Sequence, residues 1–357
     1  MRIRRASARL EEFPLTRPYA IAGQAPLDRV GNVIVEIETE SGETGLGAGS
    51  PGEHVTGETI EACAAALTEE GALAWLEGRD ARHAAALCRE AAAKWPELPA
   101  ARAAVDIALH DLVAKALGVP LCDALGRAHD AMPTSITIGI KPLDETLAEA
   151  VEYVGRGFRS LKVKIGDDLE GDLERIVRLR ERVGARTAIR VDANVGYTVA
   201  ETRLFFERTA RLGLELVEQP VPREEFNGLR DLPETWRRSI AADESLHGED
   251  DALALAAPRP LCGIYNIKLM KCGGVRPAMR IAAIAETAGV SLMWGCMDES
   301  RVSIAAALHA AFASPATRFL DLDGSLDLAR DVVSGGFELE DGVMRTTGEP
   351  GLGVRSA

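Results

Sequence analysis

The 357-residue chain lacks several features that would assign it to a common class of protein. It has no apolar run near the ~20 residues that cross a bilayer, and its start has no apolar core of a signal peptide. Its six cysteines form no C-x-x-C pair, which disfavours both a disulfide framework and a zinc site. The phosphate-binding pattern G-x-x-x-x-G-K-[ST] is also missing. We therefore expect a cytoplasmic protein whose cysteines are mostly reduced.

Basic residues are fewer than acidic ones. The chain has 41 lysines and arginines against 55 aspartates and glutamates, for a formal net charge of −14. This balance opposes the positive field that holds a polyphosphate, so we expect a small-molecule substrate, with no nucleic acid and no membrane as partners. The length exceeds the ~100–200 residues of a typical domain, which allows two domains or one large α/β barrel with an attachment.

Residues 1–125 mix strand and helix patterns, which predicts an α+β domain. Within 32–48, apolar and polar residues alternate around a Ser-Gly turn at 41–42, which predicts a β-hairpin. The glycine-rich stretch 45–52 is no dinucleotide-binding motif, because Ser50 occupies the third glycine position, and we expect it to shape a mobile capping loop. Three alanine-rich segments predict helices: 58–76, 80–94 and 98–117.

Eight short apolar runs follow, alternating with amphipathic helical segments. Their polar end residues are 27, 28, 26, 25, 25, 28 and 25 positions apart, about what one strand, one helix and two loops occupy. A (β/α)₈-type barrel brings all such ends to one mouth, whereas an open sheet would spread them along an edge and usually has five or six strands. We therefore expect a barrel. The end residues are Thr137, Lys164, Asp192, Glu218, Asp243, Lys268, Cys296 and Asp321.

Three carboxylates stand at the ends of consecutive predicted strands: Asp192, Glu218 and Asp243. Three oxygen ligands on one side of a site, with room for water and substrate, suit Mg²⁺. Any one of these residues could instead be the N-cap of the helix that follows its strand. Their matched spacing favours a shared metal site.

Lysines end two other predicted strands. Lys162 and Lys164 alternate on one strand, so both side chains point to the same face. An isolated K-x-K motif is typical of a solvent-facing edge strand, but this one lies within the series of eight. Lys268 follows Lys164 by four units, halfway round a barrel. Two amines facing each other could remove a proton from a carbon and return one on the opposite side, a 1,1-proton transfer through an enolate that the metal stabilises.

Five motifs resemble those of the enolase superfamily, in particular its muconate-lactonizing subgroup. They are K-V-K at 162–164, V-D-A-N at 191–194, E-Q-P at 218–220, A-D-E-S at 242–245 and N-I-K-L at 266–269. The resemblance covers almost the whole chain and implies Mg²⁺ as cofactor with lysine as base. Lys162 would then support the enolate electrostatically. Family members often assemble, which adds a homo-oligomer to the expectations.

The same resemblance implies a domain division. An N-terminal α+β capping domain would occupy residues 1–125, and the catalytic domain at 126–325 would be a modified TIM barrel, (β/α)₇β. A C-terminal segment, 326–357, would return to the capping domain through a hairpin with the sequence GFELEDGVMRTT.

The ending FLDLDGS is similar to a motif of the dipeptide epimerases, whose D-x-D pair holds the ammonium group of the substrate. Asp321 and Asp323 would form that pair, although two solvated strand-end carboxylates are the alternative. The stretch GCMDES at 295–300 is also similar to the family's seventh strand. The resemblance implies inversion of the α-carbon of the C-terminal residue of an L,L-dipeptide. Further residues expected at the substrate are Thr137, Cys296, Met297 and Asp298.

Specificity depends on the capping loops. In Ala-Glu epimerases an arginine there pairs with the acidic side chain of the substrate, and this sequence aligns Gln24 with that position. Without the arginine, and with Asp298 and Glu53 nearby, the pocket should repel acidic side chains and attract cationic ones. We therefore hypothesise dipeptides that contain Lys or Arg. Arg29 could instead supply the missing arginine.

Other activities share most of these residues. N-acylamino acid racemase, o-succinylbenzoate synthase and muconate cycloisomerase have the same lysines and metal ligands, but their substrates lack a free α-ammonium group for Asp321 and Asp323 to bind. A binding protein that reuses the fold without catalysis is the third alternative. It is disfavoured because both lysine bases and all three metal ligands are present.

Overall fold

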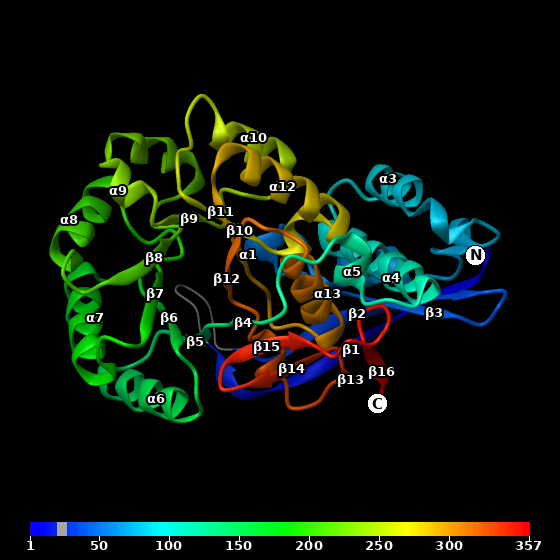
Figure 1. The fold of residues 1–357 in the computed structure, drawn as a ribbon, viewed down its shortest axis with the longest axis horizontal. Coiled ribbons are helices and arrows are strands. Elements are labelled where there is room, and N and C mark those ends of the chain that lie inside the picture. Colours follow the sequence, from blue (N-terminus) through cyan, green and yellow to red (C-terminus); the bar gives the residue numbers. More distant parts are fainter. Residues whose placement is uncertain (20–26) are drawn as a thin grey trace.

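The computed structural model describes residues 1–19 and 27–357. The N-terminal part contains an antiparallel sheet in the order β1-β2-β3 (Figure 1). The predicted hairpin is present as β2 (Leu27–Thr39) and β3 (Thr44–Gly49), and Gly42 in the turn has a φ of 92°. The long first strand, β1 (Ile3–Tyr19), was not expected. Of residues 3–17 only Ile3 and Phe13 are buried, so the strand lacks the apolar alternation that identifies a half-buried one.

Helices cover one face of this sheet. The helix expected over 58–76 is shorter, because α2 ends at Thr68, and turns with Gly71 at a φ of 78° lead into a short 3₁₀ helix. The two other expected helices are present. The helical segments here are α1 (Glu53–Thr56), α2 (Ile60–Thr68), α3 (Ala84–Lys94), α4 (Pro99–Leu117) and α5 (Leu121–Leu125).

The glycines after the hairpin turn are packing residues of a strand, so the expectation that 45–52 forms a loop was wrong for most of it. Gly47 lies in β3 directly against α4, where a Cβ atom would stand 1.9 Å from the carbonyl oxygen of Ala104. Gly45 and Gly49 face α4 in the same way. These alternating glycines let the strand and the helix approach at backbone distance.

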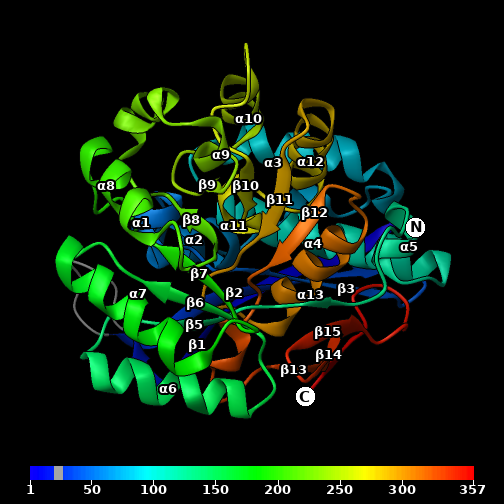
Figure 2. The same ribbon diagram turned by 60° about the vertical axis from the view of Figure 1, so that its left-hand side comes forward.

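The predicted barrel is confirmed. Eight parallel strands form one sheet in the order β12 to β5, and an isolated parallel bridge between Thr134 and Leu320 joins its two ends (Figures 1 and 2). Helical segments separate successive strands, which makes the architecture (β/α)₇β. The strands are β5 (Ile136–Ile138), β6 (Ser160–Lys164), β7 (Ala188–Asp192), β8 (Leu214–Glu218), β9 (Ile240–Ala242), β10 (Ile264–Ile267), β11 (Ser291–Trp294) and β12 (Thr317–Leu320).

Helices surround the strands on the outside, as Figure 1 shows most clearly for α6, α7 and α8. Amphipathic helices such as α7 pack through one apolar face, which is the usual arrangement of an α/β barrel, whereas α13 is buried along almost its whole length. Most of the hydrophobic core lies in this layer between strands and helices. The longer barrel helices are α6 (Leu143–Gly155), α7 (Leu169–Val183), α8 (Val199–Thr209), α10 (Glu249–Ala256), α12 (Val275–Ala288) and α13 (Arg301–Phe312).

The barrel interior changes from apolar to charged along each strand. A small apolar cluster of Leu216, Ala241, Ile264 and Met293 fills it nearer the N-terminal ends. Because side chains on one face recur every second residue, Glu218 and Asp243 point inward one layer above Leu216 and Ala241. The strand alternation therefore places the charged residues at the C-terminal ends of the strands, where barrels carry their active sites.

The C-terminal segment contacts both halves of the molecule. The expected hairpin is present as β14 (Phe337–Glu340) and β15 (Val343–Thr346), and it pairs with β4 (Met132–Pro133). Leu352 N donates to Asp111 Oδ1 on α4 at 2.8 Å. The boundaries at residues 125 and 325 stay a prediction. Within residues 1–19 and 27–357, every helix is too short or too polar to cross a bilayer.

Candidate active site

A cavity of about 310 Å³ opens at the C-terminal ends of the barrel strands. Residues 50–55, which lead from β3 into α1, form its other wall. Asp192 and Glu218 lie buried beside it, and Gln24 lies outside the described residues. The remaining predicted site residues all line this cavity: Lys162, Lys164, Asp243, Lys268, Glu53, Thr137, Cys296, Met297, Asp298, Asp321 and Asp323.

Lys162 is the centre of a buried charge cluster. Its Nζ lies 2.8 Å from Glu218 Oε2, 2.8 Å from Asp321 Oδ2 and 3.1 Å from Asp192 Oδ2. Burial opposes the charged form, but the attraction of these carboxylates outweighs it and raises the pKa of Lys162 well above its usual value. The three carboxylates around Lys162 thus favour its protonated form.

Lys164 points into the cavity from the end of β6. Its Nζ lies 2.7 Å from Asp192 Oδ2 and 2.8 Å from Asn194 Oδ1. Asn194 is held in the left-handed region with a φ of 40°, and its backbone N donates to Asp192 Oδ1 at 3.0 Å. Although burial opposes ionisation, the two lysines lower the pKa of Asp192 to about 2. The turn after β7 thus fixes the lysine and the carboxylate together.

Lys268 enters the cavity from the opposite part of the barrel, directly after β10. Its Nζ lies 2.7 Å from Asp243 Oδ2. Burial has the largest single effect on the pKa of Lys268 and would lower it, but Asp243, Glu218 and Glu244 together outweigh burial and raise this pKa. The structure therefore gives each of the two proposed bases its own carboxylate partner, Asp192 for Lys164 and Asp243 for Lys268.

The three predicted metal ligands are crowded together and shielded from solvent. Asp192, Glu218 and Asp243 are each no more than 1% exposed. Burial, followed by the neighbouring Asp192, raises the pKa of Glu218 to about 8. Glu218 Oε2 accepts no hydrogen bond of good geometry from the described residues and has only its ion pair with Lys162. A set of three buried carboxylates, one with an oxygen that accepts no hydrogen bond from the described residues, fits Mg²⁺.

Sequence reasoning missed the residues that orient these carboxylates. Gln219 Oε1 accepts from the backbone N of Asp243 at 2.9 Å and of Ser245 at 3.1 Å, which ties the end of β8 to the end of β9. Asn266 Nδ2 donates to Glu218 Oε1 at 2.7 Å. The residue type gives no signal for these roles, although Gln219 adjoins a proposed ligand within the E-Q-P motif.

The two aspartates at the end of β12 have different surroundings. Asp321 Oδ1 accepts from Ser135 Oγ at 2.6 Å, and Oδ2 pairs with Lys162. Asp323 Oδ2 accepts from the backbone N of Thr137 at 2.7 Å. Burial, followed by repulsion from Asp321, raises the pKa of Asp323 to about 7. Asp323 is therefore the member of the pair that lacks a cationic partner among the described residues.

Other predicted substrate residues support this corner of the cavity. Cys296 Sγ donates to Asp321 O at 3.2 Å and accepts from Gly324 N at 3.3 Å, so the thiol holds the loop after β12. Burial raises the pKa of Cys296 well above its usual value, which opposes a nucleophilic role. Met297 packs against Gly52, where an added Cβ would lie 2.4 Å from its Cε.

The remaining wall of the cavity is acidic. Burial, followed by Asp323, raises the pKa of Asp298 to about 6, and burial, followed by Asp298, raises that of Asp327 to about 6. Asp327 was not predicted, because it lies in the irregular chain beyond β12. Glu53 is exposed at the start of α1. Arg29 does not line the cavity and instead lies 3.2 Å from Asp28 and 3.5 Å from Glu12.

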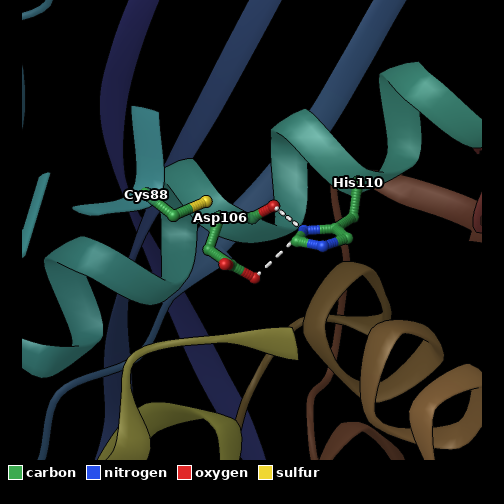
Figure 3. A group of neighbouring side chains, drawn as sticks. All are labelled: Cys88, Asp106 and His110. Atoms are coloured by element: carbon green, nitrogen blue, oxygen red, sulfur yellow. Dashed lines mark hydrogen bonds and ion pairs between the residues drawn. The ribbon is translucent and has the colours of Figure 1, made fainter. Parts of the chain in front are cut away.

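A second cluster of possible ligand types lies away from this cavity, between α3 and α4 (Figure 3). It comprises Cys88, Asp106 and His110. Asp106 Oδ1 accepts from the backbone N of Val275 at 2.6 Å, at the start of α12. His110 Nδ1 lies 2.7 Å from Asp106 O and 3.2 Å from Oδ1. The contact of Asp106 with Val275 connects α4 to a barrel helix, so we assign a structural role to this cluster.

Two family models match the chain. The model described as mandelate racemase / muconate lactonizing enzyme, N-terminal domain, matches residues 6–126, and the model described as enolase C-terminal domain-like matches residues 145–356. The chain therefore belongs to the mandelate racemase/muconate lactonizing enzyme family of the enolase superfamily. This confirms the family assignment that the five sequence motifs predicted.

Within this family the chain is similar to proteins that act on dipeptides. A protein from Methylococcus capsulatus named L-Lys-D/L-Arg epimerase is 60% identical over 354 residues, 99% of each chain. A protein of the same name from Desulforapulum autotrophicum is 56% identical over 356 residues, again 99% of each. A crystal structure of the Methylococcus capsulatus dipeptide epimerase, complexed with Mg and the dipeptide L-Arg-D-Lys, matches with a TM-score of 0.97 and 60% identity over 99% of both chains.

Proposed function

We propose that this protein is a Mg²⁺-dependent dipeptide epimerase that inverts the α-carbon of the C-terminal residue of an L,L-dipeptide. One observation carries the proposal: Lys164 and Lys268 extend from β6 and β10 into a single cavity. Because these strands are four positions apart in the eight-stranded barrel, a carbon held between them would meet one amine on each face. The names of the similar epimerases support the same reaction.

Asp192, Glu218 and Asp243 would hold the metal ion. When bound, Mg²⁺ supplies positive charge beside the substrate carboxylate, where negative charge accumulates after the α-proton leaves. Lys162 adds a fixed positive charge below the same group. One of Lys164 and Lys268 removes the α-proton, and the other returns a proton to the opposite face, which inverts the carbon.

Asp323, with Asp321 beside it, would receive the ammonium group at the N-terminus of the dipeptide. Asp321 is already neutralised by Lys162, so Asp323 has the greater capacity to pair with a new cation. This contact holds one end of the substrate while the metal centre holds the carboxylate at the other. The α-carbon of the C-terminal residue is thereby kept between the two lysines.

We also propose that the preferred dipeptides carry Lys or Arg side chains. Asp298, Asp327 and Glu53 line the cavity, and the described part of the lining has no arginine. Such a wall attracts a cationic side chain and repels a carboxylate. Comparison of kcat/KM across a panel of L,L-dipeptides tests this. Lys- and Arg-containing peptides should rank first, and a preference for Ala-Glu would contradict the proposal.

Incubation in D₂O tests the reaction itself. An epimerase should incorporate deuterium at the α-carbon of the C-terminal residue and produce the L,D-dipeptide, with both outcomes dependent on Mg²⁺. If N-succinyl or other N-acyl amino acids were turned over faster than free dipeptides, the related racemases would be the better assignment. An unexchanged α-proton in every dipeptide would favour a binding protein instead.

The cellular setting of this activity is a separate part of the proposal. We propose a cytoplasmic enzyme, on the basis of the reduced cysteines and the sequence composition. The net charge of −14 disfavours nucleic acid and anionic membranes as partners. Assembly into a homo-oligomer is expected from the family and can be measured by light scattering.

A further inference from the structure

Lys271 lies behind the proposed metal centre and engages one oxygen of Asp243. It extends from α11 (Leu269–Cys272), one helical turn after Lys268, and is 3% exposed. Its Nζ contacts Asp243 Oδ1, and it also lies 2.6 Å from Asp243 O and 3.2 Å from Asn266 O. All three contacts are with acceptors around the ends of β9 and β10.

Two lysines therefore share Asp243, one on each carboxylate oxygen. Lys268 Nζ is 2.7 Å from Oδ2, and both of these residues line the active-site cavity. Lys271 does not line that cavity but a separate one of about 510 Å³, which His247 and Cys272 also line. Lys271 is thus placed to act on the carboxylate without contacting the substrate.

The carboxylate of Asp243 is restrained from several directions. The backbone N of Asp243 donates to Gln219 Oε1 at 2.9 Å, while the backbone carbonyl oxygen and Oδ1 of Asp243 both accept from Lys271. Rotation that brought Oδ1 toward the cavity would separate it from a buried ammonium group, which is costly because the cation would lose a partner without regaining water. Oδ2, which lies 2.7 Å from Lys268 Nζ, is consequently the oxygen on the cavity side.

We propose that Lys271 is a positioning residue that keeps Asp243 a one-oxygen ligand and thereby makes the centre select Mg²⁺ over Ca²⁺. Mg²⁺ requires a compact octahedral arrangement, whereas the larger Ca²⁺ takes more oxygen ligands and often binds both oxygens of a carboxylate. Because Lys271 engages Oδ1, Asp243 can supply one oxygen to the compact shell of Mg²⁺ but cannot supply both oxygens to Ca²⁺. The inference rests on the proposed function, because it assumes a metal centre at Asp243.

Calorimetric titration of the full-length, metal-free protein with MgCl₂ or CaCl₂, without substrate, tests this. The wild type should bind Mg²⁺ at least about tenfold more tightly than Ca²⁺. Lys271→Met keeps most of the side-chain length but removes the charge, so it should free Oδ1 and lower the ratio of Mg²⁺ to Ca²⁺ affinity by about tenfold or more. Lys271→Arg, which keeps a cation, should restore part of the preference.

Lys115→Met is the matched control. Lys115 Nζ lies 2.7 Å from Asp111 Oδ2 on α4, a comparable pair remote from the cavity, and its loss should leave the affinity ratio unchanged. If Lys271→Met had the same ratio of Mg²⁺ to Ca²⁺ affinity as the wild type, the role of Lys271 would be refuted but the proposed function would not. Absence of Mg²⁺ binding by the wild type would overturn the proposed function as well. If Lys271→Met fails to fold, Lys271→Gln replaces it. Independently of any variant, equal affinities of the wild type for Mg²⁺ and Ca²⁺ would reject the inference.

Discussion

Asp321 Oδ2 lies 2.8 Å from Lys162 Nζ, deep in the barrel mouth. Because Ser135 Oγ donates to the other oxygen at 2.6 Å, Asp321 has both oxygens engaged. Asp323, two residues later, has no such cation beside it in residues 1–19 and 27–357, and its pKa is raised to about 7. We therefore propose that Asp321 has mainly a structural role and that Asp323 binds the substrate, and substitutions can separate these roles.

Asp323→Asn should weaken substrate binding without unfolding the protein. The asparagine can still accept from Thr137 N, the hydrogen bond that the native side chain accepts at 2.7 Å. It no longer offers a negative charge to the substrate ammonium group, a charge-assisted hydrogen bond of about 1.5–3 kcal/mol. Steady-state kinetics should therefore show KM raised by roughly 10- to 100-fold, with the melting temperature close to that of the wild type.

Asp321→Asn should act mainly on stability. The substitution removes one charge-assisted hydrogen bond of Lys162, which keeps Glu218 and Asp192 as partners, and such a loss costs about 1.5–3 kcal/mol. We expect a clear fall in the free energy of unfolding, measured by urea denaturation. If the asparagine variants at 321 and 323 changed stability and KM equally, the division of roles between the two aspartates would be wrong.

Lys268→Ala should separate proton removal from inversion. Epimerisation requires both amines, so it should fall by about 10²- to 10⁴-fold, the usual contribution of one acid or base. Lys164 remains on the other face and should still exchange the α-proton of one substrate stereoisomer in D₂O. Proton NMR follows the exchange, and chiral chromatography follows the epimer. Exchange of both stereoisomers at the wild-type rate would contradict the two-base arrangement.

His309 should make the fold sensitive to mild acid. It is buried in α13 and accepts from Cys122 N at 3.0 Å, and burial lowers its pKa from 6.5 to about 4. In the unfolded chain His309 becomes protonated below pH 6.5, whereas in the folded protein it stays neutral down to about pH 4. The stability that this residue contributes above pH 6.5 is therefore lost as the pH falls from 6.5 to about 4. At pH 5 the loss from this group is about 2 kcal/mol.

His309→Asn provides the comparison for that effect. The amide oxygen can take the place of Nδ1 as acceptor but does not titrate. Between pH 7 and pH 5, the free energy of unfolding of the wild type should therefore fall about 2 kcal/mol further than that of the variant. Urea denaturation at the two pH values measures the difference, and parallel losses in the two proteins would exclude His309 as the cause.

Asp106→Ala should loosen the contact between α4 and the barrel. The substitution leaves Val275 N without the acceptor that lies 2.6 Å away, and it also removes the carboxylate beside His110. A buried donor without its acceptor costs about 1–3 kcal/mol. Asp130→Ala is the control, since that side chain is 93% exposed and should have little effect on stability. Equal denaturation midpoints for the two variants would refute this role.

The barrel strands could be predicted because a residue with a polar or thiol side chain lies within two positions of the end of each strand, at a nearly constant spacing. That spacing follows from the size of a β/α unit, so Lys164, Asp192 and Asp243 could be assigned to one mouth without coordinates. The strand β1 could not be recognised, because most of its side chains are not buried, and backbone pairing with β2 defines it instead. The length of α2 was overestimated because alanine favours a helix but does not mark its end.

The supporting residues of the site were beyond the reach of sequence patterns. Gln219, Lys271 and Asp327 lie outside the strands, in turns, a short helix and an irregular segment. Their roles depend on which side-chain atoms they meet, and those atoms belong to neighbouring strands. Periodicity assigns a residue to a face of its own element but does not specify contacts between elements.

The order of residues along the chain was sufficient to establish the barrel, the alternation of inward charges and the candidate set of bases and ligands, because strand period and unit length are local properties. The pairing of each charge was decided by folding alone. Three features depend on distances of a few ångströms between distant segments: which carboxylates surround Lys162, which oxygen of Asp243 each lysine engages, and which of Asp321 and Asp323 pairs with Lys162. Electrostatic energies at that range change steeply with position.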